Sequence, residues 1–136
     1  MSTTRVEFRS IPGTEAAVGI AGGHTLIADR PSGVAGDQGL GFNGGQLLGL
    51  AIGGCMCNDL RYMAHKMGIT LTALSVDVTV HLTDGDPRLV TDADVTIKVE
   101  ADDAKADLAD LVRRARADTT IGNSLGRGIN IRYPSA

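Results

Sequence analysis

Residues 43–57 read NGGQLLGLAIGGCMC and begin the segment that decides the fold of this chain. The pattern predicts a helix over residues 46–67 that is apolar nearly all round in its first half, so we expect it to be central and buried. Three glycines lie inside this helix, Gly49, Gly53 and Gly54, and each lowers helix stability by about 0.8–1 kcal/mol relative to alanine. That cost needs a compensating reason: Gly49 and Gly53 share one face, which lets another backbone approach closely.

Cys55 lies in this helix directly after two glycines. A thiol inside a buried helix is usually inert packing, but one approached over two positions without side chains is more open to reaction. The other cysteine, Cys57, is two residues further on, about 200° round the helix, so the two cannot pair unless the helix unwinds. Cys57 is a candidate second thiol, although a small buried hydrophobe is its simplest interpretation. We expect no metal site, because the side chains of Cys55, Cys57 and His65 do not converge.

Runs of strands are predicted on both sides of this helix, and shorter helical segments follow the second run. The sequence predicts strands over residues 3–9, 14–20, 24–29, 70–83, 88–100 and 128–133, a second helix over residues 104–117 and a short helical turn over residues 119–126. Gly68 is the expected C′ residue of the main helix, and Asp102 or Asp103 the expected cap of the second. Residues 30–45 are rich in glycine and predict a long loop, and residues 84–87 predict a hairpin turn.

A length of 136 residues fits one domain over residues 1–136. The chain has 18 glycines, no tryptophan and only two Tyr and two Phe, so its core must be built from aliphatic side chains. The net charge is −3, from 13 basic and 16 acidic residues, and no basic cluster is interleaved with aromatics. We therefore expect neither a nucleic-acid nor a membrane partner. Residues 1–25 show no signal-peptide pattern. No apolar run reaches the length of about 18 residues that a membrane span needs. Since the two cysteines are also expected to be reduced, we expect a cytoplasmic location.

The order of the elements indicates an α+β fold, because the strands come in runs instead of alternating with helices. A central helix that is apolar on every side must be covered on every side. One small sheet cannot do this, so we expect a partner subunit to complete the cover.

Two motifs resemble those of the OsmC/Ohr family of hydroperoxide-reducing proteins. The family pattern is Asn-Pro-Glu-x-Leu, a stretch of small residues and then Ala-Cys, and residues 43–47 (Asn-Gly-Gly-Gln-Leu) followed by Gly53-Gly54-Cys55 fit it without a gap. Residues 117–125 lie in register with the second family signature, a helix that ends in Cys-Pro-Val/Ile-Ser-x-x-Leu. The resemblance covers residues 20–133.

The resemblance implies an intertwined homodimer in which antiparallel sheets wrap around two long central helices, one from each subunit. In such a dimer Gly49 and Gly53 would be the positions where the helices meet. It also implies a site at the subunit interface where a peroxidatic cysteine attacks a hydroperoxide and becomes a sulfenic acid. A second cysteine then resolves it as a disulfide, and a dithiol reduces that disulfide. An arginine from the N-terminal part and the glutamate of the first motif orient the thiolate.

Mapped onto this chain, Cys55 occupies the peroxidatic position. The resolving position is Thr119, which cannot form a disulfide, and the glutamate position is Gly45, which has no carboxylate. Arg30, at the start of the glycine-rich loop, is the first candidate for the arginine, and Arg9 is the second. The chain therefore resembles the branch of the family that lacks a second cysteine.

Asp59 lies one helical turn after Cys55, on the same face. A carboxylate there disfavours a thiolate unless a cation bridges the two groups. Asp59 is therefore a candidate for holding the site arginine in place of the lost glutamate. Arg113, Arg114 and Arg116, in the second helix, are interpreted as a solvated face.

Two functions of different classes remain open. The first is a one-cysteine peroxidase of oxidative-stress defence: Cys55 would reduce a small organic hydroperoxide and be restored by an external thiol or dithiol, without a cofactor. The second is a non-catalytic protein that binds an apolar or acyl-like ligand in the cavity of the dimer interface. Retention of Cys55 favours the first, and the changes at Gly45 and Thr119 favour the second.

Overall fold

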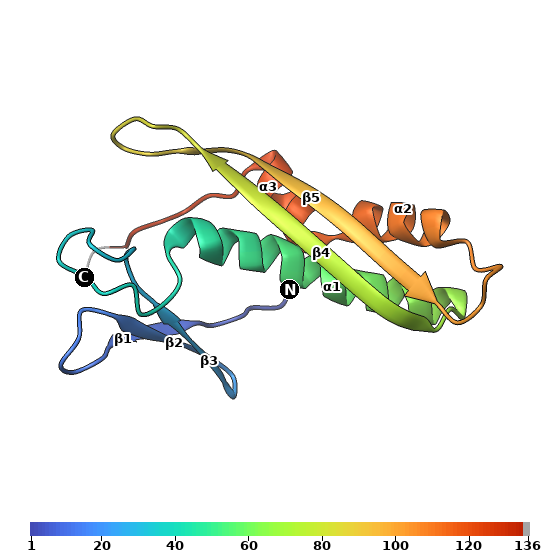
Figure 1. The fold of residues 1–136 in the computed structure, drawn as a ribbon, viewed down its shortest axis with the longest axis horizontal. Helices are drawn as coiled ribbons and strands as arrows, with labels where there is room; N and C mark the ends of the chain where they lie inside the picture. Colours follow the sequence, from blue (N-terminus) through green and yellow to red (C-terminus); the bar gives the residue numbers. More distant parts are fainter. Residues whose placement is uncertain (135–136) are drawn as a thin grey trace. The chain divides into compact units, whose positions relative to one another are not determined.

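The computed structural model describes residues 1–134, which form an α+β chain of two compact units (Figure 1). Residues 1–47 make up the N-terminal unit and the residues from 48 onward the C-terminal unit, and each unit is considered by itself. The helices and strands of the described chain are β1 (Glu7–Ser10), β2 (Ala17–Ala21), β3 (His24–Ala28), α1 (Gly44–Met67), β4 (Leu71–Leu82), β5 (Val90–Ala101), α2 (Leu108–Asp118) and α3 (Thr120–Arg127).

The N-terminal unit is an antiparallel meander in the order β1–β2–β3, as the sequence predicts. The glycine-rich segment after β3 leaves the sheet and returns to its edge, where Phe42 N donates to Ile27 O at 2.8 Å and Asp29 N donates to Phe42 O at 3.0 Å. Gly41 is required at this return, because a Cβ there would lie 2.2 Å from Ile27 O. The predicted loop is therefore closed at its base by backbone hydrogen bonds.

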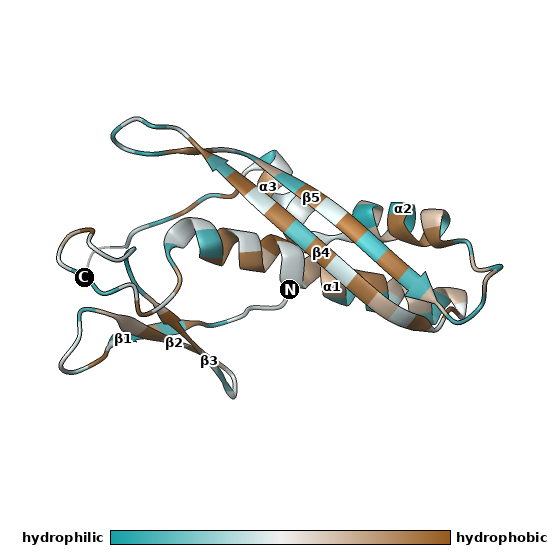
Figure 2. Cartoon of the chain, viewed as in Figure 1, coloured by the Kyte–Doolittle hydropathy of each residue, from teal (hydrophilic) through white to brown (hydrophobic). Residues whose placement is uncertain are grey.

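The C-terminal unit consists of the β4–β5 hairpin with helices packed on one face. Hydrophobic and hydrophilic residues alternate along both strands (Figure 2), so one face of the hairpin is apolar. The core lies between this face, α1 and α2, and its buried members are Met56, Leu60, Met63, Ala64, Leu71, Leu111 and Ala115. The two predicted long strands and the turn between them are confirmed.

The ends of α1 are determined by local sequence. Asn43 and Gln46 form a reciprocal capping box, in which Gln46 N donates to Asn43 Oδ1 at 2.9 Å and Asn43 N donates to Gln46 Oε1 at 3.0 Å. At the other end Gly68 has a φ of 67° and Ile69 N donates to Ala64 O at 2.9 Å, which confirms Gly68 as the C′ residue. The helix therefore begins two residues before the predicted start and ends where predicted.

Three predictions about the elements are wrong. The cap of α2 is Asp107, which accepts from Asp110 N at 3.0 Å, because Asp103 is used in a preceding turn where it accepts from Lys105 N at 2.8 Å. The second helix consequently starts at residue 108 instead of 104. Residues 128–133 form no strand in the described chain, because no neighbouring strand pairs with them and their apolar side chains are exposed.

The third error concerns two glycines of α1. The helix itself is not covered on every side in the single chain, which agrees with the expectation that a partner subunit completes its cover. Its buried residues face β4, β5 and α2, whereas Leu50, Ala51 and Gly54 are exposed. Gly49 and Gly53 do not face outward toward a partner helix: a Cβ at Gly53 would lie 3.1 Å from Val78 Cγ2, and one at Gly49 would lie 3.4 Å from Val80 Cγ2. Their close approach is therefore to β4 of the same chain.

This packing predicts opposite effects at the two adjacent glycines. We expect Gly53→Val to lower the free energy of unfolding by about 1–3 kcal/mol, because the added methyl groups overpack the contact with Val78. Gly54→Ala is the matched control: a Cβ there meets nothing within 4 Å in the described part of the chain, so stability should rise by up to about 1 kcal/mol. Urea denaturation of both variants at one protein concentration measures the difference. Equal losses would contradict the assignment of Gly53 to the β4 contact.

Candidate functional site

Cys55 lies between two polar side chains in the C-terminal unit. Its Sγ donates to Asp59 Oδ2 at 3.4 Å and accepts from Thr119 Oγ1 at 3.7 Å. The cysteine is partly exposed, and its neighbour Gly54 is exposed. The thiol therefore has a proton acceptor on one side and a hydroxyl donor on the other.

Asp59 is brought to the sulfur by helix geometry, since residues four apart share a face. Within residues 1–134 its carboxylate takes part in no ion pair, and its side-chain hydrogen bond is to the thiol. In the single chain Asp59 therefore acts on Cys55 directly.

Thr119 reaches Cys55 from a distant part of the sequence. It is the residue between α2 and α3, and it is only 6% exposed. Gly122 leaves room for it, because a Cβ there would lie 3.0 Å from Thr119 Cγ2. The resemblance identified this position as one that has lost its cysteine, and the structure places its hydroxyl beside the sulfur. The motif alignment gave its position, but nothing in the sequence indicated a contact of the hydroxyl with the thiol.

A groove of about 460 Å³ lies beside this cluster in the C-terminal unit, and Thr119 forms part of its wall. Its other lining residues come from α1, β5, α2 and α3, and most are apolar: Ile52, Met56, Ala93, Asp94, Val95, Ile97, Val112, Arg116 and Gly122. The groove thus combines aliphatic and polar surface next to the residue that touches the Cys55 sulfur.

Arg116 is a groove residue that the sequence does not single out. Arg113, Arg114 and Arg116 are all exposed, as predicted for a solvated face, and the first two pair with Asp110. The hydrogen bond from Arg113, with the charges of both arginines, holds the pKa of Asp110 below its usual value. Arg116 instead lines the groove, and it has no ion pair to a residue within the described range. Its one-turn spacing from Thr119 is the sequence signal that could have identified it.

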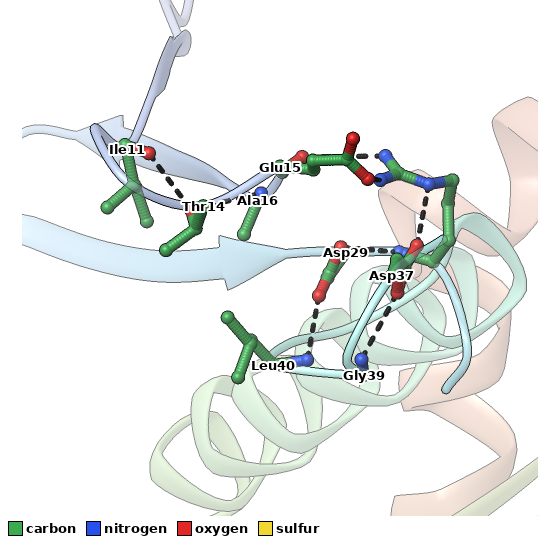
Figure 3. A network of polar contacts seen from close by, with 9 residues as sticks. Ile11, Thr14, Glu15, Ala16, Asp29, Asp37, Gly39 and Leu40 are labelled. Atoms are coloured by element: carbon green, nitrogen blue, oxygen red, sulfur yellow. Dashed lines mark hydrogen bonds and ion pairs between the residues drawn. The ribbon is translucent and has the colours of Figure 1, made fainter. Parts of the chain in front are cut away.

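Arg30, the first candidate for the site arginine, belongs to the N-terminal unit and is held there by two carboxylates. Figure 3 shows these carboxylates, from Glu15 and Asp37, within the polar network of this unit. Its Nε lies 2.6 Å from Asp37 Oδ2 and its Nη2 lies 2.9 Å from Glu15 Oε2. The Asp37 side chain is only 1% exposed and also accepts from Gly39 N at 3.1 Å. Asp29 accepts from Arg30 N and from Leu40 N, at 2.9 and 2.7 Å. The glycine-rich loop is thus folded around the arginine.

Arg9, the second candidate, lies in β1 and pairs with Glu7 at 2.8 Å. Gly45 lies in the first turn of α1, which contains no acidic residue. Its neighbours Asn43 and Gln46 serve as the helix cap, so the first motif retains its structural role without the carboxylate.

Cys57 is partly buried, and both cysteines are free thiols. Over residues 1–134, no group of three or more His, Cys, Asp or Glu side chains is arranged to hold a metal ion. The helices in that range are also too short or too polar to cross a membrane.

Comparison with known proteins supplies the family. The model of the OsmC-like protein family matches residues 36–133, which span the boundary between the two units. No curated protein sequence matches the chain significantly.

Solved structures share the fold at low sequence identity. An OsmC-like protein of unknown function from Vibrio cholerae is 13% identical, with a TM-score of 0.76 over 90% of this chain and 93% of that one. An OsmC-like protein from Mycoplasma pneumoniae is 15% identical, with a TM-score of 0.75 over 92% and 88% of the two chains. An organic hydroperoxide resistance protein from Elizabethkingia anophelis is 14% identical, with a TM-score of 0.63 over 90% and 87%.

Three findings agree with one another: the α+β order with two antiparallel sheets, the cysteine in the first long helix, and the family match over residues 36–133. The chain belongs to the OsmC-like protein family.

Proposed function

We propose that this protein reduces organic hydroperoxides as a one-cysteine, thiol-dependent peroxidase through Cys55. The observation that carries the proposal is the position of the Cys55 sulfur between the Asp59 carboxylate and the Thr119 hydroxyl. A nucleophilic cysteine needs a base to take its proton and donors to stabilise the negative charge, and these two groups supply one of each. The likeness in fold to organic hydroperoxide resistance proteins supports an organic hydroperoxide as the substrate class.

The reaction follows from these roles. Asp59 takes the thiol proton, and the thiolate attacks the terminal oxygen of the hydroperoxide. The O–O bond breaks, the sulfur becomes a sulfenic acid, and the departing alkoxide takes a proton to leave as an alcohol. Because Thr119 cannot form a disulfide, an external thiol must displace water from the sulfenic acid. A second equivalent, or the second thiol of a dithiol, then releases Cys55 as a thiol.

Arg30 remains the candidate for the arginine of this site, because Asp37 and Glu15 hold its guanidinium in a defined orientation. Cys57 remains a candidate second thiol. Its position two residues after Cys55 on α1 argues against an internal disulfide between them.

We further propose that the protein acts as a homodimer with a single OsmC-like domain in each subunit, in the cytoplasm. The family model crosses the boundary between the two units, which supports one domain. Two exposed apolar surfaces support a partner copy: Leu50 is 49% exposed on α1, and the segment after α3 exposes Ile129, Ile131 and Tyr133.

The second candidate function is a non-catalytic protein that binds an apolar or acyl-like ligand. The groove beside Thr119 favours it, because its volume and its combination of aliphatic side chains with a few polar groups are typical of small-molecule sites. The lack of a carboxylate at Gly45 and of a thiol at Thr119 also fits a protein that has lost turnover.

Peroxide titration of the purified protein, with a dimedone-type trap for sulfenic acid, distinguishes the two functions. We expect one equivalent of an organic hydroperoxide to give a trapped adduct on Cys55 in the wild type and none in Cys55→Ser. The Cys57→Ser variant is the matched control and should retain the adduct. The absence of any adduct on Cys55 at a slight excess of hydroperoxide would rule out the peroxidase and leave the binding function.

A further inference from the structure

We infer that the groove beside Cys55 selects amphipathic anions, and that Arg116 is the residue that recognises their charge. This inference deepens the proposed function, on which it rests for the chemistry at Cys55, by naming the ligand class of the same site. The ligand would be an elongated apolar molecule with a single anionic group, such as a carboxylate, near one end.

The apolar part of the recognition comes from three elements. Ile52 and Met56 contribute from α1, Val95 and Ile97 from β5, and Val112 from α2. Among residues 1–134, no aromatic residue lines this wall, so the wall offers aliphatic contact and no stacking. A flexible hydrocarbon chain matches such a surface better than a planar ring does.

The charge part of the recognition comes from Arg116. The other arginines of α2, Arg113 and Arg114, are engaged by Asp110, whereas Arg116 has no ion pair among residues 1–134. The groove also contains the carboxylate of Asp94, which lies 2.8 Å from His81 Nε2 and forms an ion pair when that histidine is protonated. Arg116 presents a guanidinium without an ion pair to the same groove, and a planar guanidinium is suited to a carboxylate.

The location of the groove connects this recognition to the thiol. Thr119 lines the groove and its Oγ1 lies 3.7 Å from Cys55 Sγ. Arg116 lies three residues before Thr119, the C-cap of α2, and both line the same groove, so we expect the anionic group of a bound molecule to lie on the Thr119 side of the groove. A molecule in the groove should consequently hinder other reagents from reaching Cys55.

The test uses octanoate and 1-octanol as probes on the full-length protein. Binding is followed by NMR titration of the isotope-labelled chain, and protection of Cys55 is followed by its rate of alkylation with iodoacetamide. We expect octanoate to bind, to protect Cys55, and to bind about tenfold more tightly than hexanoate, because two more methylene groups are buried.

The decisive comparison is Arg116→Gln against Arg113→Gln, which removes the same charge from the side of α2 that pairs with Asp110. We expect Arg116→Gln to weaken octanoate binding about fivefold and to leave 1-octanol binding within twofold. Arg113→Gln should change neither. Each rate of alkylation is compared with and without probe in the same variant, so an altered reactivity of Cys55 does not enter the result.

The inference is overturned if octanoate does not bind, if Arg116→Gln changes both probes equally, or if Arg113→Gln has the same effect. Its failure can be told apart from failure of the peroxidase. If octanoate binding depends on Arg116 but Cys55 forms no sulfenic acid, the ligand class is supported and the peroxidase function is rejected. If Cys55 is oxidised to a sulfenic acid but Arg116 has no role in binding, the peroxidase function is supported and the ligand class is rejected.

Discussion

Thr119→Cys is expected to change the product of Cys55 oxidation from a sulfenic acid to an internal disulfide. The Oγ1 of Thr119 lies 3.7 Å from Cys55 Sγ, so a sulfur at the same position needs to move by less than about 2 Å to reach bonding distance. Attack of the introduced thiol on the sulfenic acid should then outpace trapping by an external reagent, because the two groups are held together.

Intact mass and non-reducing peptide mapping after one equivalent of hydroperoxide measure this change. The Thr119→Cys variant should lose two hydrogen atoms and give no trapped adduct, whereas the wild type gives the adduct. Thr120→Cys is the matched control, since the next residue is exposed and lies in the first turn of α3. Disulfide formation to the same extent in the control would mean that the contact between Thr119 and Cys55 does not direct the reaction.

Asp59→Asn is expected to slow both hydroperoxide reduction and alkylation of Cys55, by about 100-fold for the peroxide reaction. The carboxylate is the hydrogen-bond acceptor of the thiol, and an amide of the same shape cannot take its proton. General base catalysis typically contributes a factor of this size or larger.

Stopped-flow measurement of both reactions, with Asp77→Asn as the control, tests this role. Asp77 is an exposed carboxylate on the outer face of β4, so its loss changes the net charge equally without touching the site. Unchanged kinetics in Asp59→Asn would remove Asp59 from the site. Faster alkylation at neutral pH would show that the negative charge opposes the thiolate instead of assisting it.

The parts of the fold that depend on local pattern were predictable from the sequence. The meander over β1–β3, the hairpin of β4 and β5 and the main helix follow from alternation and helical periodicity, which adjacent residues determine. The cap of α2 was predicted wrongly because several aspartates compete for it: Asp103 forms its own turn and leaves the cap to Asp107. The segment 128–133 has the spacing of a strand, but a strand also needs a partner, and the sequence does not say which chain supplies one.

The sequence by itself determined the family motifs, the position of Cys55 one turn before Asp59, and the absence of both the acid at Gly45 and the second cysteine at Thr119. Only the tertiary structure decided what surrounds the thiol. Thr119 is 64 residues from Cys55 and comes to it because α2 and α3 meet beside α1. What distinguishes Arg116 from Arg113 and Arg114 is the side of α2 on which it lies, because Arg116 lines the groove whereas the other two pair with Asp110. Contacts between distant segments depend on how helices and sheets pack, and this packing is a property of the whole core that no local pattern encodes.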